Sequence, residues 1–419
     1  MDDINGAQEA LKAIGQRLKA EDSDERRWAV FDLEAFEPDL SLAYLIKAIQ
    51  DENRAVREAA SEVLETIPAS ISAAQLTPLL GSTRIEVRNT VAAVLVKYGN
   101  DAIVDLMEAL FHDNEDVRKF GADILGLTRN PRAVDGLCRV ALEDVVENVV
   151  VSAIEALGKI KSRQALPTLY RIYESDRGMQ AETVEAIGLI GHPESALFLE
   201  SKLTVDDPIV AYAIIDALGN IAAKSSLAVL EQFMVTAPEI LIEPICYSIL
   251  KIGQKQRLDV IREPGSPLFQ SVLASLNKTN DHLADLIADQ LAFTHDPEIR
   301  HQLFQRHDDL PSNLLVTLLK SVRNETQLQV DVCSLVLHED DWVAYTAIEV
   351  LTHFSPHTIA SAILPVFDSE RELPVIAAMK LAVNMRLIEA IPAIQRLAAS
   401  DNEDIAASAQ QALEELQNT

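Results

Sequence analysis

Two histidines with helical spacing are the first residues that could do chemistry in this 419-residue sequence. His353 and His357 lie four residues apart, a spacing that on one helix would present both rings to a single metal ion. Pro356 lies between them and is expected to begin or end a helix there, because proline breaks a helix interior. The one His-Glu pair, His338-Glu339, falls in an acidic turn. We therefore expect no metal site and no cofactor.

Motifs for nucleophilic or nucleotide chemistry do not occur in the sequence, which has no G-x-S-x-G, no P-loop and no G-x-G-x-x-G after a strand. The three cysteines, Cys138, Cys246 and Cys333, are far apart and form no C-x-x-C. That usage indicates small buried side chains in a reducing compartment. We expect no catalytic residue and a non-catalytic protein.

The charge balance narrows the class of partner. The formal net charge is −29, so the chain offers no basic surface for the phosphates of a nucleic acid, and we expect no nucleic-acid partner. The electrostatic complement of such an acidic chain is a protein with a basic surface. Apolar runs are too short for a membrane span, so we expect no membrane insertion. The start, MDDINGAQEALKAIG, is acidic and has no export signal, which predicts a cytoplasmic protein.

The sequence contains an internal repeat, and this repeat determines where any functional side chains lie in the fold. An Ala-x-x-Leu-type run recurs every 30 to 32 residues, skips the interval between Leu250 and Leu351, and then resumes. That interval is 101 residues, or three periods plus about eight to ten residues, so the chain holds about thirteen units of about 31 residues. The anchor residues are Leu33, Leu64, Leu95, Leu125, Leu157, Ile187, Leu218, Leu250, Leu351, Leu381 and Leu413.

Each unit is predicted to be a pair of helices joined by an acidic turn. The first helix is short and often carries an early proline, as at Pro167, Pro365 and Pro392, where the missing N–H costs nothing. The Asp and Asn residues of the turn are suited to cap the second helix. The four clearest turns are QDEN (50–53), HDNED (112–116), VDDP (205–208) and SDNED (400–404).

The unit resembles a HEAT repeat, in particular the short bacterial kind of phycobilisome-lyase-like proteins. The resemblance rests on D-x-x-x-V-R-x-x-A-A-x-x-L-G at Asp113–Gly126, supported by segments 53–64, 85–95, 152–162 and 182–193. It implies an all-α, right-handed α-solenoid (an armadillo/HEAT-like superhelix) that acts as a protein-interaction scaffold. The alternative that it implies is a bilin-chromophore lyase or chromophore-protein chaperone.

The resemblance also implies a structural ladder of arginines between neighbouring repeats. Arg26, Arg57, Arg88 and Arg118 lie seven residues before their anchors, where such arginines commonly bond the acidic turns. Beyond the fourth unit this position carries other residues, such as Val150. We therefore expect less uniform stacking after the fourth unit.

A row of carboxylates is the main candidate binding surface. The residue two before the anchor is acidic in six of eleven aligned units, whereas 65 acids in 419 residues would give about two. In a HEAT-type stack the second helices line the concave face, so the row predicts an acidic groove for a basic partner. The open alternative is a merely solvated face. The six acids are Glu62, Asp123, Glu155, Glu185, Asp216 and Glu349.

The two tryptophans of the sequence are candidate contact residues. Trp28 with Phe31, and separately Trp342, are possible aromatic anchors for a partner, with end-capping or packing between repeats as the alternative.

One segment interrupts the repeat pattern. It is GQKQRLDVIREPGSPLFQ (253–270), which has extra residues and a Pro-Gly-Ser-Pro turn signal. It predicts two repeat arms, 1–253 and 268–419, joined by an irregular insertion or hinge at 254–267.

Overall fold

The structure is a computed structural model that describes residues 2–175, 178–276, 281–291, 293–294, 296–322 and 326–417. These residues form α-helices and short 3-10 helices and contain no β-strand. Within the described residues no helix has the length and apolar character needed to cross a membrane. The chain divides into two compact units, Met1–Ile221 and Ala222–Thr419.

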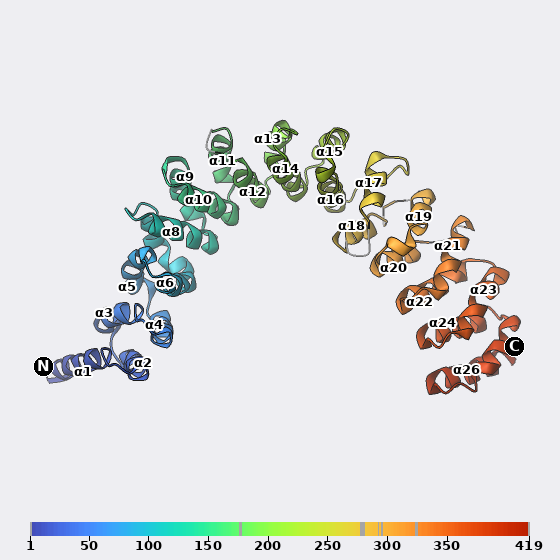
Figure 1. Cartoon of the computed structure of the whole chain (residues 1–419), viewed down its shortest axis with the longest axis horizontal. Coiled ribbons are helices and arrows are strands. Elements are labelled where there is room, and N and C mark those ends of the chain that lie inside the picture. The colour runs from blue at the N-terminus through green and yellow to red at the C-terminus, as the bar shows by residue number, and fades with distance from the viewer. Residues whose placement is uncertain are drawn as a thin grey trace. The chain divides into compact units, whose positions relative to one another are not determined.

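The N-terminal unit is an α-solenoid of seven helix pairs, with the odd-numbered first helices in one row and the even-numbered second helices in another (Figure 1). The second helices of neighbouring pairs pack against each other from α2 to α14. The helices are α1 (Asp2–Arg17), α2 (Ser23–Phe31), α3 (Pro38–Ala48), α4 (Arg54–Thr66), α5 (Ala69–Leu76), α6 (Ile85–Tyr98), α7 (Ile103–Ala109), α8 (Glu115–Thr128), α9 (Val134–Glu143), α10 (Glu147–Ile160), α11 (Leu166–Tyr173), α12 (Gln180–Ile190), α13 (Ser195–Lys202) and α14 (Pro208–Ile221).

The C-terminal unit repeats the arrangement in six pairs, and its second helices pack in order from α16 to α26. Its helices are α15 (Ser226–Met234), α16 (Glu239–Gln256), α17 (Pro267–Ser275), α18 (Asp281–Leu291), α19 (Pro297–Phe304), α20 (Ser312–Ser321), α21 (Gln329–Ser334), α22 (Asp341–Val350), α23 (Pro356–Ile363), α24 (Glu372–Asn384), α25 (Ile391–Leu397) and α26 (Glu403–Gln417). The described residues thus hold thirteen pairs, which confirms the predicted solenoid of about thirteen units.

Short 3-10 helices extend or precede many of the α-helices. They are η1 (Asp32–Ala35), η2 (Thr77–Gly81), η3 (Gly99–Ala102), η4 (Pro131–Ala133), η5 (Arg163–Ala165), η6 (His307–Asp309), η7 (Thr326–Leu328), η8 (Leu335–Leu337), η9 (Leu351–His353), η10 (Leu364–Asp368) and η11 (Ile388–Ala390). They lie in the connections between successive α-helices, both within pairs and between pairs, where a 3-10 turn is tighter than an α-helical turn.

The four predicted acidic turns cap the second helices that follow them. Asn53 accepts a hydrogen bond from the N–H of Ala55 (2.8 Å), and Asn114 accepts one from Asp116 (2.8 Å). Asp207 and Asn402 do the same for the first turns of α14 and α26. Each cap satisfies N–H groups that have no partner inside the helix, which confirms the expected role of these turns.

Prolines take the helical positions that the sequence predicts. Pro167 and Pro392 lie in the first turns of α11 and α25, Pro365 in that of η10, and Pro356 begins α23. Pro244 differs, because α16 continues through it as an interior residue.

The anchor residues form the core of each unit. Ten of the eleven are buried, with exposed fractions from 0 to 4%. Leu413 is half-buried and lies on α26, the last helix of the described residues. The repeated leucine therefore marks the face on which neighbouring helices stack.

The segment between α16 and α17 is irregular but held in place. Helix α16 includes the first three residues of the predicted insertion, so the irregular part is 257–266. Ile261 is buried, and the N–H of Val260 donates to Oε1 of buried Gln290 (3.1 Å). The extra residues lengthen this one repeat and leave two helix pairs, α17/α18 and α19/α20, in the interval without anchors. The predicted arms 1–253 and 268–419 stay a prediction.

Candidate functional site

The six predicted carboxylates lie on the solvent-facing side of six second helices. Five of them are exposed and Asp123 is half-buried, whereas the anchor two residues later is buried in every case. Glu62, Asp123, Glu155, Glu185 and Asp216 belong to the N-terminal unit, and Glu349 lies on α22 of the C-terminal unit. The row is therefore accessible within each unit.

Two of the carboxylates are neutralised by lysines on their own helix. Nζ of Lys119 lies 2.8 Å from Oδ2 of Asp123, and Nζ of Lys159 lies 3.1 Å from Oε2 of Glu155. Both are pairs four residues apart, the spacing that places side chains together on one helix face. Asp123 and Glu155 therefore present little net charge to a partner.

The other four carboxylates have no basic partner among the described residues. Glu62 and Glu185 are exposed and form no ion pair in this part of the chain. Asp216 accepts only from the neutral amide of Asn220, at 2.8 Å. Glu349 accepts from the hydroxyl of Tyr345 (2.7 Å), a hydrogen bond that raises the pKa of Tyr345. These four side chains carry the uncompensated charge of the row.

Glu62 also lines an open depression of about 660 Å³ between α4 and α6. Three further glutamates, absent from the predicted row, line it as well, and each has a cation nearby. The pairs are Glu58 with Arg54 (2.7 Å), Glu86 with Arg84 (3.2 Å) and Glu65 with Lys97 (3.9 Å). Glu62 is thus the carboxylate of this depression that is open to a ligand cation.

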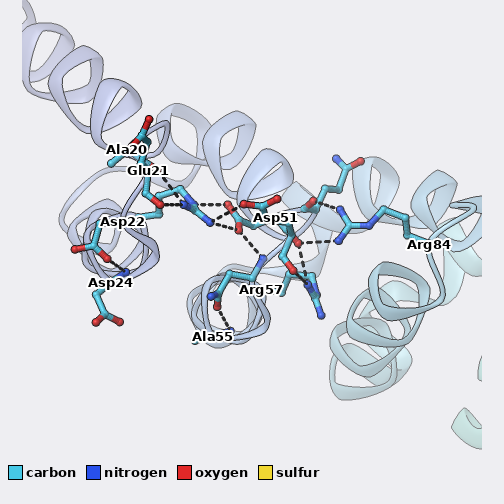
Figure 2. Close-up of polar contacts among 12 residues, drawn as sticks. Ala20, Glu21, Asp22, Asp24, Asp51, Ala55, Arg57 and Arg84 are labelled. Atoms are coloured by element: carbon cyan, nitrogen blue, oxygen red, sulfur yellow. Dashed lines mark hydrogen bonds and ion pairs between the residues drawn. The ribbon is translucent and has the colours of Figure 1, made fainter.

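Arg26 joins the first two repeats through a two-pronged ion pair. Its Nε and Nη2 each donate to a carboxylate oxygen of Asp51 at 2.9 Å, and Nη1 donates to the carbonyls of Ala20 and Glu21 (Figure 2). Burial alone would raise the pKa of Asp51, but hydrogen bonds from Arg26 and the Asn53 N–H outweigh it and hold that pKa below its ordinary value. The pair fixes the turn before α4 to the start of α2.

Arg118 makes the same kind of contact at the fourth repeat. Its Nε lies 2.7 Å and its Nη2 3.2 Å from the two carboxylate oxygens of Asp144, and Nη1 donates to the carbonyls of His112 and Asp113. Burial would raise the pKa of Asp144, but the hydrogen bond from Arg118 and those from nearby backbone N–H groups lower it overall. Arg26 and Arg118 thus each join one repeat to the next.

Arg57 and Arg88 occupy the same position but form no two-pronged ion pair among the described residues. Nη1 of Arg57 donates to the carbonyls of Asp51 and Glu52 at 2.9 Å, and its buried Nε has no partner among the described residues. Nη1 of Arg88 donates to the carbonyl of Ser82 (2.8 Å). Arg57 therefore binds the turn of its own repeat, whereas Nη1 of Arg88 also lies 3.6 Å from Oδ2 of Asp116 at the start of α8, a longer ion pair to the next repeat.

Arg84 supplies the missing connection and was not predicted. It is the residue before α6, and its guanidinium donates to the carbonyls of Gln50 (2.7 Å) and Asp51 (3.1 Å), which lie in the preceding turn (Figure 2). Arg371, the residue before α24, likewise donates from Nε to Oδ1 of Asp341 (2.6 Å). The arginine before a second helix is therefore another inter-repeat contact.

Close glycine–alanine contacts take over where the predicted arginine ladder ends. A Cβ on Gly126 would lie 2.9 Å from Cα of Ala156, and one on Gly158 would lie 2.9 Å from Cα of Ala186. A Cβ on Gly188 would lie 2.9 Å from the Cβ of Ala217. Helices α8, α10, α12 and α14 therefore approach closely, so the less uniform stacking expected beyond the fourth unit does not hold between the fourth and seventh units. The repeated Ala-Leu-Gly or Ala-Ile-Gly run carried this signal.

Both tryptophans are exposed rather than packed between repeats. Trp28 is 61% exposed, and its ring centroid lies 6.1 Å from that of Phe31. Trp342 is 65% exposed and contacts Tyr345 with ring centroids 5.8 Å apart. The packing alternative is therefore wrong for both indoles, and their role as anchors stays a prediction.

The described residues contain no group of three or more His, Cys, Asp or Glu side chains placed to hold a metal ion. His353 ends η9 and His357 lies in α23, so the two rings are on separate elements. The three cysteines are free thiols. Burial raises the pKa of the Cys246 thiol to about 12, which keeps it protonated and unreactive near neutral pH.

Residues 11–96 and 101–178 match the family model for HEAT repeats. This part of the chain consists of HEAT repeats. The matched residues lie in the N-terminal unit and include Arg26, Arg57, Arg84, Arg88 and Arg118 and three of the six carboxylates. The finer phycobilisome-lyase-like type stays a prediction.

Several solved structures are similar to the chain at low identity. Importin beta in a polyethylene glycol condition is 13% identical, with 97% of this chain and 77% of that chain covered and a TM-score of 0.49. Importin beta in an ammonium sulfate condition is 12% identical, with 97% of this chain and 74% of that chain covered and a TM-score of 0.48. An engineered protein is 18% identical, with 97% of this chain and 99% of that chain covered and a TM-score of 0.30. No curated protein matches this chain.

Proposed function

We propose that the chain is a non-catalytic scaffold that binds a protein partner with a basic surface through the exposed carboxylates of its second helices. HEAT repeats generally serve as protein-interaction scaffolds, and their second helices present a continuous row of side chains. The alternative, a bilin-chromophore lyase or chromophore-protein chaperone, rests on the resemblance alone.

The observation that supports the proposal is the division of the row into neutralised and free carboxylates. In the N-terminal unit, Glu62, Glu185 and Asp216 are exposed without a basic neighbour among the described residues. An exposed charge with no internal partner contributes to the field that an approaching protein meets, whereas Asp123 and Glu155 form close dipoles with their lysines. The free carboxylates should therefore dominate recognition.

The experiment compares two variants against a partner identified by carbodiimide cross-linking, which joins lysines to contacting carboxylates. One variant carries Glu62→Gln, Glu185→Gln and Asp216→Asn, and the control carries Asp123→Asn and Glu155→Gln. We expect association of the first variant to be about tenfold slower at low salt, because steering acts on the on-rate, with a smaller change in the control.

Two results would refute the proposal. Association of the triple variant at the wild-type rate in low salt would show that the free carboxylates do not recognise the partner. Equal slowing in both variants would show that the internal lysines do not decide which carboxylates act. In the first case Trp28 and Phe31 become the surface to test, by substitution with alanine.

A further inference from the structure

A lysine-lined cavity of about 530 Å³ lies between α1 and α3. Its walls come from the second half of α1, the turn after it and the end of α3. Lys12, Lys19 and Lys47 are the three lysines of the first 96 residues, and all three line this one cavity. The chain has 65 acidic and 36 basic residues, so a gathering of cations is contrary to its overall charge.

The three ammonium groups are exposed and have no carboxylate partner among the described residues. Asp51 is the one acid of the cavity lining, and both of its carboxylate oxygens are bound by Arg26. The Asp51–Arg26 pair is neutral as a unit. The cavity therefore carries a net charge of about +3 from its lysines.

Gly15 lies on α1 with Lys12, and Tyr44 lies on α3 with Lys47, so both line the cavity beside the lysines. A Cβ on Gly15 would lie only 2.6 Å from Cε1 of Tyr44, so the absence of a side chain allows the tyrosine ring to lie against α1. Tyr44 and Gln16 bring a hydroxyl and an amide to the lining. These groups can donate hydrogen bonds to oxygen atoms of a ligand.

We infer that this cavity binds a small anion with about three negative charges, of the polyphosphate or tricarboxylate class. Its volume is within the range of about 300–1,000 Å³ typical of small-molecule sites. Lysine binds phosphate and carboxylate oxygens as a point charge, so three lysines select for charge more than for geometry. The site is separate from the carboxylate row, which attracts cations, and its failure would leave the proposed function intact.

The test is titration calorimetry of the full chain at low salt and neutral pH with two probes, tripolyphosphate and citrate. The site variant carries Lys12→Gln, Lys19→Gln and Lys47→Gln. The control carries Lys161→Gln, Lys224→Gln and Lys380→Gln, three exposed lysines from elsewhere in the chain. Both variants lose the same total charge, so a general electrostatic effect would change them equally.

We expect at least one probe to bind with a submillimolar Kd and to bind at least tenfold more weakly to the site variant, with less than twofold change in the control. Hydrogen exchange with the bound probe should slow in 12–19 and 44–51. Binding of tripolyphosphate alone would identify phosphate oxygens as the preferred chemistry, and binding of both probes would identify charge. Absence of binding by both, or equal weakening in the two variants, would overturn the inference.

Discussion

Replacing Gly158 by alanine tests whether the close approach of second helices stabilises the middle of the N-terminal unit. Gly158 is buried in α10, and an added Cβ would lie 2.9 Å from Cα and 3.1 Å from Cβ of Ala186 on α12. A backbone atom cannot rotate away as a side-chain end can. The helices must therefore separate by several tenths of an ångström.

The expected loss combines two opposing terms. Forcing an extra methyl group into a packed contact costs about 1–3 kcal/mol. Alanine in place of glycine in a helix returns about 1 kcal/mol through backbone entropy. Since the contacting atom is backbone, the cost should fall in the upper half of its range. We expect Gly158→Ala to lower the free energy of unfolding by about 1–2 kcal/mol.

Gly136→Ala is the matched control, because Gly136 also lies inside a helix, α9. Its Cβ would meet only the Cδ1 of Leu110 at 3.1 Å, the movable end of a side chain. This variant should be unchanged or up to about 1 kcal/mol more stable. Ala186→Gly should cost less stability in the Gly158→Ala background than in the wild type, since there it also removes the clash with the methyl group of residue 186, though not the clash with its backbone.

Urea unfolding followed by circular dichroism measures the midpoint shift, and hydrogen exchange measures local opening of α10 and α12. The local measurement is needed because stacked repeats need not unfold in one step. Equal stabilisation by Gly158→Ala and Gly136→Ala would refute the reasoning, because it would show that the two helices separate without cost.

Two further predictions concern the turn before α4 and the segment after α16. Asp51→Asn should cost about 3 kcal/mol, since it leaves buried Arg26 without its carboxylate. The folded-state pKa of Asp51 is lowered, so wild type should keep this advantage above about pH 4 and lose it as the pH falls further, in unfolding curves measured at several pH values. Limited trypsin treatment should cut first at Arg257 or Arg262, both exposed, and Gln290→Ala should speed that cut by releasing Val260. A first cut elsewhere inside the chain, or uniform exchange protection of 254–268, would contradict a hinge.

The period of the anchors predicted the fold well because each anchor carries one local requirement. A leucine that recurs every 31 residues or so on a helical face must be buried by a neighbouring copy of the same unit. The capping residues of the acidic turns were equally readable, since a cap acts within three residues of its own position. The limits of the insertion were less accurate, because α16 continues through Pro244 and ends at Gln256.

Contacts between repeats were harder to predict because they depend on separation in space. Nothing local indicates that Arg84 reaches the carbonyl of Gln50, 34 residues earlier in the sequence. The close approach of Gly158 to Ala186 has a visible sequence signal, yet only the distance between helices shows its importance. By contrast, the pairing of Lys119 with Asp123 could have been predicted from their spacing of four residues.

The packing of second helices also helps to explain why Glu155 is neutralised while Glu185 remains free. Lys159 on α10 and Leu189 on α12 lie at the same repeat position, two residues after the anchor, and each packs over the glycine of the preceding helix. Lys159 covers that glycine with its alkyl chain and neutralises Glu155 with its ammonium group. Leu189 covers the equivalent glycine without a charge and leaves Glu185 uncompensated. One position therefore serves the same packing role in both repeats, and the choice of lysine or leucine there sets the charge that the repeat presents to a partner.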